Sequence, residues 1–257
     1  MTLPIIRDPF FIPFGESVIA SELPDQFSVS GTEPHPLCLV AAEDLQLHLQ
    51  SQRDWIHNFG LSPDTDEGVI IGKMFGVLVV RTQEDEIGYL AAFSGKLAGG
   101  NHHPKFVPPV FDSLTDQSFL NNGMQELTRI NEEIGRLEDL KSEAFEEGVK
   151  HLKALRKSNS IALQNELFDN YRFLNQDGKE KSLNTIFKTA SRKSPPSGAG
   201  ECAAPKLLQY AYKKNMKPLA LAEFWWGQSP KSDFWKHGHF YSPCREKCEP
   251  ILAHMLS

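Results

Sequence analysis

Apolar residues recur along the chain at helical and strand spacings, and this pattern outlines the elements of an α/β protein. Near-helical spacing with acidic residues in between predicts a helix over residues 38–50, with an apolar face made of Leu39, Ala42, Leu45 and Leu47. The runs at 77–80 and 87–93 are apolar, and the polar segment 82–86 separates them. This arrangement predicts a β-hairpin whose arms are covered on both faces.

A Gly- and Pro-rich stretch over residues 97–115 marks a boundary, and a long amphipathic pattern follows it. Apolar residues step by three and four from Leu127 to Leu155, while acidic residues occupy the other face of the early part. Beyond Ser158-Asn159-Ser160, a second helical pattern covers 161–174. The two patterns predict a long antiparallel helical hairpin of coiled-coil type.

The C-terminal part becomes strongly patterned again after a basic segment at 175–200, which ends in Pro, Ser and Gly and predicts a linker. The pattern then predicts a helix, a strand and a final helix, at 202–213, 219–226 and 243–255. Ser242 is the expected N-cap of the last helix. Four regions follow from this: an extended arm at 1–35, two parts of an α/β domain at 36–110 and 196–257, and a helical insertion with a basic linker at 111–195.

The overall composition is that of an ordinary globular protein, with 40% hydrophobic and 23% charged residues. Its first residues lack a basic start and an uninterrupted apolar stretch, so a cytoplasmic protein without a signal peptide is expected. In that reducing compartment the 4 cysteines are not expected to form disulfides. Cys38 has no partner motif and is expected to be a small buried hydrophobe.

Charge is distributed unevenly along the chain. Residues 1–149 hold 9 Lys and Arg against 24 Asp and Glu, whereas residues 150–257 hold 18 against 9. Such asymmetry indicates a surface for an acidic partner such as RNA, or mutual attraction between the two halves. The candidate nucleic-acid contacts are Lys150, Lys153, Arg156, Lys157, Arg192 and Lys193, together with Trp226 as a stacking aromatic residue.

Three of the cysteines are placed to bind a metal, for which zinc is the expected ion. Cys244 and Cys248 lie four residues apart at the start of a predicted helix, so both sulfurs project from the same side. Cys202 opens another predicted helix, and helix N-termini favour the thiolate form that ligates metals. Three thiolates leave a fourth position for water or for His237 or His239. Three buried, inert cysteines are the alternative.

The order of these elements resembles the zinc-dependent cytidine and nucleobase deaminase fold, over roughly residues 36–95 and 196–257. The resemblance implies a three-layer α/β/α sandwich, interrupted here by the helical hairpin. The signature of that family is His-x-Glu or Cys-x-Glu followed by Pro-Cys-x-x-Cys, with the glutamate shuttling protons. This chain has three residues between Cys244 and Cys248, and Ala204 at the glutamate position. Glu201, which precedes Cys202, is the candidate catalytic residue.

A resemblance at the level of sequence covers nearly the whole chain. It looks like the N-terminal extension of long bacterial RluA-type pseudouridine synthases, most distinctively in GECAAPKLLQYAY, KPLALAEFWWG and HGHFYSPCREKCEPILAHML. In those proteins a synthase domain with an Arg-Leu-Asp motif follows the extension. The similar string at 136–139 lies in a charged predicted helix and is interpreted as solvated surface.

The resemblance implies an accessory role in RNA modification, in which the chain binds tRNA or rRNA beside a pseudouridine synthase domain in cis or in trans. Two alternatives belong to other classes. One is a zinc-dependent deaminase-like hydrolase, and the other is a structural protein that forms homodimers through its coiled-coil hairpin.

Overall fold

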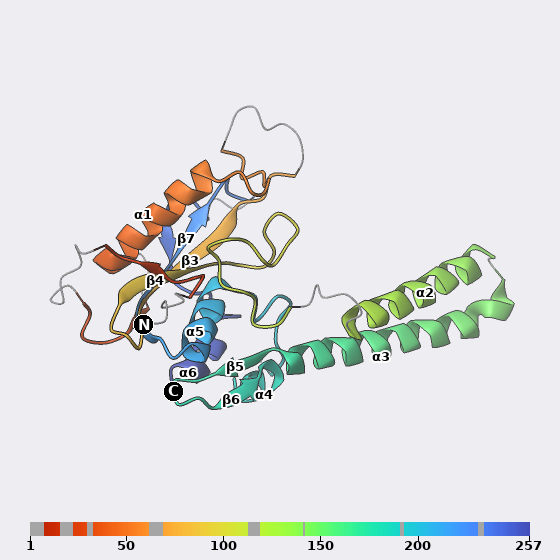
Figure 1. The fold of residues 1–257 in the computed structure, drawn as a ribbon. Helices are drawn as coiled ribbons and strands as arrows, with labels where there is room; N and C mark the ends of the chain where they lie inside the picture. The colour runs from red at the N-terminus through yellow and green to blue at the C-terminus, as the bar shows by residue number, and fades with distance from the viewer. Residues whose placement is uncertain are drawn as a thin grey trace, which may run out of the picture.

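The computed structural model describes residues 8–15, 23–29, 33–61, 69–112, 119–140, 142–190, 193–230 and 234–257. It is a mixed α/β fold, which confirms the predicted class at that level. Figure 1 shows a twisted sheet covered by helices, which we call the body, and two long helices that project away from it. In the described ranges, no helix is both long and apolar enough to cross a membrane.

One sheet organises the body. Across the sheet the strands are β1 (Ile12–Pro13), β4 (Ile87–Phe93), β3 (Lys73–Arg81), β7 (Lys217–Trp226) and β2 (Ser28–Val29), and β8 (Phe240–Tyr241) also pairs with β7. The predicted hairpin is confirmed, because β3 and β4 pair antiparallel with Val77 opposite Ala91. On its other side β3 pairs antiparallel with β7. Described pieces of the predicted N-terminal arm, β1 and β2, therefore complete both edges of the sheet.

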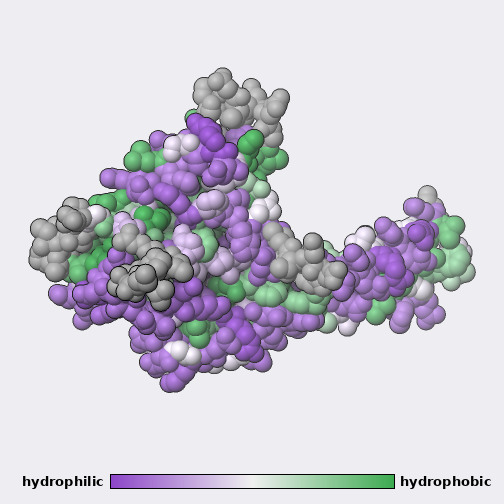
Figure 2. Space-filling view, in the orientation of Figure 1, coloured by the Kyte–Doolittle hydropathy of each residue, from purple (hydrophilic) through white to green (hydrophobic). Residues whose placement is uncertain are grey.

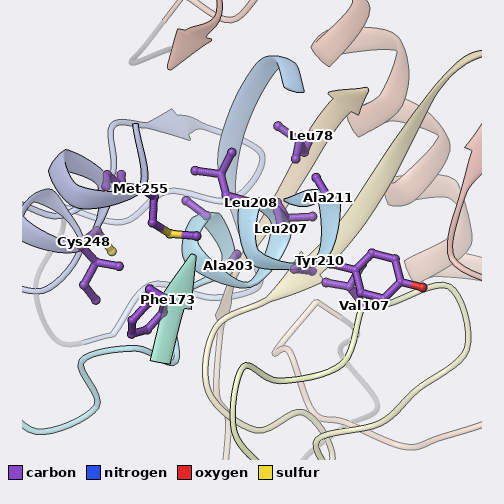
Figure 3. Close-up of a cluster of buried hydrophobic side chains, with 14 of the residues drawn as sticks. Leu78, Val107, Phe173, Ala203, Leu207, Leu208, Tyr210, Ala211, Cys248 and Met255 are labelled. Carbon is purple, nitrogen blue, oxygen red and sulfur yellow. The ribbon is translucent and has the colours of Figure 1, made fainter. Parts of the chain in front are cut away.

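Alternating side chains on the strands form two cores, one on each face of the sheet. On β3, Val77 and Val79 join the core under helix α1 (Pro36–Ser51). Leu78 and Val80 join the core under α5 (Ala203–Lys213) and α6 (Glu249–Met255). Figure 3 shows this second core, where Leu207 and Leu208 of α5 lie among residues from several elements. Helix α5 therefore packs directly on the sheet.

The predicted helix at 38–50 exists as α1, but the predicted apolar face is partly wrong. Leu39 is 40% and Leu47 is 64% exposed, whereas Leu37 and Leu49 lie against the sheet with Leu45. The buried stripe includes Cys38, which is fully buried as expected. Small residues of α1, such as Cys38, Ala41 and Ala42, occupy much of the face that packs on the sheet. Two of the leucines in the predicted apolar face therefore point to solvent.

Two helices, α2 (Phe119–Asp139) and α3 (Glu146–Asn170), lie side by side and form what we call the helical arm (Figure 1). The turn predicted at 158–160 is wrong, because α3 continues through it. The chain instead reverses between α2 and α3, where the short helix η2 (Glu143–Phe145) lies. Serine and asparagine are tolerated at exposed helical positions when a neighbouring helix supplies the packing.

The base of the arm is held by aromatic contacts with the body. Phe111 contacts both Phe119 at the start of α2 and Tyr171 just after α3, with ring centroids 6.2 and 5.6 Å apart. Near this base, a Cβ atom on Gly123 would lie 2.5 Å from the Leu163 side chain, so only glycine lets the two helices approach. Figure 2 shows a mostly hydrophilic arm with apolar surface near its far end.

The segment predicted as a basic linker is largely structured. It contains β6 (Glu180–Ser182) and α4 (Leu183–Lys188), which begins at the cap Ser182. Strand β6 pairs with β5 (Arg172–Leu174), which replaces the last residues of the helix predicted at 161–174, because α3 ends at Asn170. Leu183, Ile186 and Phe187 are buried in the core beneath α5 and α6. The linker prediction is therefore wrong for this part of the segment. Its composition is mostly charged and polar, and only a few apolar residues anchor it in the core.

Candidate metal centre

Cys202 is the N-cap residue of α5, and its side chain does not cap the helix. Two side chains from the sheet bind the free backbone N–H groups of the first turn instead. Ala203 N donates to Ser94 Oγ at 3.2 Å, and Ala204 N donates to Glu223 Oε1 at 3.0 Å. Because these partners satisfy the helix end, the sulfur of Cys202 remains available as a ligand.

A tight turn presents the second pair of cysteines. The prediction of a helix from residue 243 with Ser242 as its cap is wrong, since α6 begins at Glu249 and Cys248 is its N-cap. Within the preceding turn, Cys248 N donates to Cys244 O at 3.1 Å. This bond closes one helical turn, so the two sulfurs still lie 3.4 Å apart. The predicted proximity holds although the predicted helix does not.

Cys202, Cys244 and Cys248 meet at one point. Their sulfur atoms all lie within 4.8 Å of one another. A tetrahedral zinc site with Zn–S bonds of about 2.3 Å separates its sulfurs by about 3.8 Å, so the donor set and the spacing fit zinc. Cys248 is buried, Cys202 is half-buried and Cys244 is exposed. The open side of the cluster therefore lies at Cys244.

Contacts among the three thiols shift their pKa values in different directions. Hydrogen bonds with Cys202 and Cys248 hold the pKa of the Cys244 thiol far below its ordinary value. Hydrogen bonds with Cys202 and Cys244, together with burial, raise the pKa of Cys248. The hydrogen bond with Cys244 is the main cause that raises the pKa of Cys202. A thiolate is the state in which a cysteine ligates metal, and these hydrogen bonds favour that state most at Cys244.

Glu223 is the residue of this centre that the sequence analysis missed. It lies in β7 with only 4% of its surface exposed, and burial raises the pKa of its carboxyl to about 7. Its negative charge raises the pKa values of Cys202 and Cys248 as well. A signal was present, because Glu223 is the single acidic residue in the otherwise apolar run LALAEFWW. A lone acid in a buried strand indicates a specific partner.

Glu201, the predicted catalytic residue, points into a different polar group. Its Oε1 atom accepts a hydrogen bond from the Tyr171 hydroxyl at 3.0 Å. An ideal Cβ on Gly95 would lie 3.9 Å from both Glu201 Oε2 and Lys73 Nζ, so these two charged groups flank one glycine. Buried Lys206 lies in the same neighbourhood and donates to Phe93 O and Gly95 O at 2.9 and 3.1 Å.

The predicted histidine ligands lie elsewhere. Among the described residues, the cysteine trio is the group of His, Cys, Asp and Glu side chains that gathers closely enough for a metal, and neither His237 nor His239 belongs to it. His237 Nδ1 instead accepts from Gly227 N, and its ring packs on Trp226 at 4.3 Å. Trp226 is only 3% exposed, so the expectation that its ring is accessible for stacking is wrong.

The predicted RNA contacts lie mainly on the arm. Lys150, Lys153, Arg156 and Lys157 are exposed on α3, Lys193 is exposed at the edge of the body, and Arg192 falls outside the described residues. Two of the arm cations have partners on α2. Lys153 Nζ lies 2.6 Å from Glu138 Oε1, and Arg156 donates to Asn131 Oδ1 at 2.6 Å. Part of the predicted basic face therefore also holds the two helices together.

Comparison with known proteins adds no family assignment. No protein-family model, no curated protein and no solved structure matches this chain.

Proposed function

We propose that this chain is a zinc-stabilised, RNA-binding accessory module of an RluA-type pseudouridine synthase system, and not the synthase itself. The observation that carries the proposal is the cluster of Cys202, Cys244 and Cys248, which links the start of α5 to the start of α6. Zinc bound there would tie together two elements that pack on the same face of the sheet. Metal binding of this kind contributes directly to folding free energy.

The arrangement of the body supports the finer fold proposal, a deaminase-like sandwich. Helix α1 lies on one face of the sheet and α5 and α6 lie on the other, with β3 antiparallel to both β4 and β7. The cysteines stand at the start of α5 and of α6, as the zinc ligands of that fold do. The helical arm enters between β4 and α5, which supports the proposal of an inserted antiparallel hairpin.

The charge of the chain supports the RNA part of the proposal. Lys150 and Lys157 are exposed on the arm, and no hydrogen bond or ion pair is recorded for them among the described residues. Cations of this kind contact phosphates by releasing counterions, which makes binding salt-dependent. The excess of basic over acidic residues after residue 150 points the same way.

Fluorescence anisotropy with labelled tRNA and rRNA fragments tests this function. The zinc-loaded protein should bind at micromolar concentration or better, with affinity that falls steeply as salt rises. A protein stripped of metal by a chelator should bind more weakly, because the body loses its order around the cysteines. Absence of binding at low salt, or binding insensitive to salt, would contradict the proposal.

A second candidate function, a zinc-dependent deaminase-like hydrolase, is favoured by one observation. Glu223 Oε1 bonds to the backbone of Ala204, the position at which the deaminase motif places its proton-shuttling glutamate. A carboxylate therefore lies beside the cysteines although the motif lacks one in sequence. Zinc would supply a Lewis acid at this site, and Glu223 would hold the proton that hydrolysis has to move.

The Glu223→Gln variant separates the two functions. A glutamine oxygen still accepts from Ala204 N, so zinc content should match that of the wild type. If zinc-loaded wild type deaminates cytidine, adenosine or their nucleotides and Glu223→Gln loses this activity by about 100-fold or more, the hydrolase is correct. If neither protein shows turnover, the accessory function stands.

A further inference from the structure

Four aromatic side chains gather at the surface beside the cysteines. Trp225 from β7 stacks on Trp235 with ring centroids 5.4 Å apart and planes inclined by 22°. Phe234 and Tyr241 contact Trp235 edge-on, at 4.8 and 4.7 Å. Phe234 is 65% exposed, and Trp225, Trp235 and Tyr241 are half-buried. We call these four residues the aromatic platform.

The platform is preorganised by hydrogen bonds. The Tyr241 hydroxyl donates to Phe234 O at 2.9 Å and accepts from Lys236 N at 2.7 Å. The Trp235 carbonyl accepts from the Ser229 hydroxyl, and Trp225 Nε1 donates to Gln228 O. These bonds fix the backbone on both sides of the rings. A planar ligand would therefore stack without first ordering the site, which lowers the entropic cost of binding.

The position of the platform relates it to the metal centre. Along β7, Leu221 enters the core beneath α5 while Ala222, Phe224 and Trp226 enter the core beneath α1. By this alternation Glu223 and Trp225 share the α5 face. Tyr241 is the register partner of Glu223 and precedes Cys244 by three residues. The platform and the cysteines thus occupy neighbouring positions on one face of the sheet.

The charge around the platform selects its ligand. Between Phe234 and Cys248 the sequence carries Lys236, Arg245 and Lys247 against one acidic residue, together with two histidines. Aromatic rings with cations close by in sequence match the chemistry of single-stranded nucleic acid, whose bases stack while its phosphates require positive charge. A purely apolar protein partner would not need these cations.

We infer that the aromatic platform binds unpaired bases of single-stranded RNA next to the cysteine cluster. This inference rests on the proposed RNA-binding function and gives it a location on the body, separate from the cations of the arm. Phe234 offers its exposed ring face to a base. Trp235 stacks on Trp225 and contacts the rings of Phe234 and Tyr241, so it holds the platform together.

The experiment measures binding of a fluorescein-labelled oligouridylate of about ten nucleotides by anisotropy, with quenching of tryptophan fluorescence as a second readout. Trp235→Ala and Phe234→Ala should each raise Kd by about 5- to 100-fold, since stacking on one aromatic side chain has that magnitude. Trp235→Phe keeps a ring and should stay within about threefold of the wild type. Phe145→Ala removes a ring that is 39% exposed at the N-cap of α3 and serves as the matched control.

Zinc content and the thermal midpoint of each variant establish that the fold is intact. Because Phe234 is largely exposed, Phe234→Ala should fold even if Trp235→Ala does not. Wild-type affinity and quenching in a folded Phe234→Ala and Trp235→Ala would overturn the platform while leaving the RNA-binding function standing. Failure of the wild type to bind any RNA would overturn both. A change of oligomeric state in Phe234→Ala, with RNA binding unchanged, would identify the platform as a contact between copies and overturn the inference.

Discussion

The body and the helical arm are stabilised in different ways. In α5, nine of 11 residues are buried between the sheet and its neighbours. In α2 two of 21 residues are buried, and in α3 one of 25, Phe168, which lies in the core of the body. The body is therefore held by a core shared among many elements, whereas the arm is held by one helix–helix seam and by surface ion pairs.

This difference predicts where substitutions act. In the body a single change alters both the core and the cysteine cluster, because α5 provides residues to both. In the arm a change stays local, since few contacts extend beyond the partner helix. The arm can accordingly present charge to a partner without affecting the metal centre, and the following predictions test that separation.

The largest effect is expected for Cys244→Ser. Zinc should fall from about one equivalent to well under half, because two thiolates and an open position bind far more weakly than three. The thermal midpoint should fall by roughly 8–16 °C, since losing a ligand present at about 1,000 times its Kd costs about 4 kcal/mol. Elemental analysis and calorimetry measure both quantities.

Cys38→Ser is the control for this variant. Cys38 is fully buried on the face of α1 that packs on the sheet, and burial raises the pKa of its thiol to about 12, so it is an inert core residue. Its substitution should lower stability but leave zinc content unchanged. Full zinc content in Cys244→Ser, or loss of zinc in Cys38→Ser, would show that the cluster is not the metal site.

The next effect concerns RNA and the arm. We expect weaker RNA binding, by ~10-fold or more, when three arm cations are changed together to glutamate: Lys150, Arg156 and Lys157. The slope of log affinity against log salt should fall by about 2 to 3, because each cation is expected to make one phosphate contact. Zinc content should not change. As a matched control, Lys188, Lys213 and Lys217 are exposed on the body and carry the same charge change. Equal losses from both triple variants would mean that only net charge matters.

A smaller effect is expected at Gly76, where α5 approaches β3. An ideal Cβ here would lie 3.0 Å from the Ala203 Cβ and 3.1 Å from Leu207 Cδ1. Gly76→Val should therefore lower the free energy of unfolding by about 1–3 kcal/mol through overpacking. Urea denaturation measures this. Gly15→Ala, where a Cβ meets nothing within 4 Å, should stay near zero.

The smallest effect has the opposite sign. Gly135 lies in α2, and nothing lies within 4 Å of an added Cβ. Gly135→Ala should stabilise the arm by about 0.5–1 kcal/mol through helix propensity. Native-state hydrogen exchange should show slower exchange in α2 and α3 with little change in β3 and β7. Increased protection throughout the sheet would instead show that the arm and the body unfold together.

The sequence predicted elements whose signals are local. The β3–β4 hairpin follows from two apolar runs around a polar turn. The proximity of Cys202 to Cys244 and Cys248 was predicted from their places at the starts of two predicted helices, and it holds although the second helix begins later than predicted. The turn of the arm was misplaced because Leu137 and Leu140 extend the apolar repeat to the chain reversal, while the serines at 158 and 160 suggest a break that packing on α2 overrides.

What the sequence did not predict depends on contacts between distant elements. Ser94, the residue after β4, and Glu223 of β7 cap α5, and neither fits a local capping pattern. Trp225 and Trp226 are adjacent in one strand, and only the packing of α1 against the sheet determines that Trp226 is the buried one. Strand alternation predicts opposite faces for the two but not which face is solvated.

The aromatic clasp at the base of the arm has a consequence for the order of folding. The central pairing of β3 with β7 joins segments on either side of the insertion, so its formation requires closure of a long loop. The arm depends on contacts that are close in sequence, so we expect it to form early in folding. Once Phe111 meets Phe119 and Tyr171, the ends of the insertion are already together. A folded arm thus shortens the effective loop that must close before β7 can pair with β3. During synthesis of the chain, the unpaired edge of β3 should then be exposed for less time.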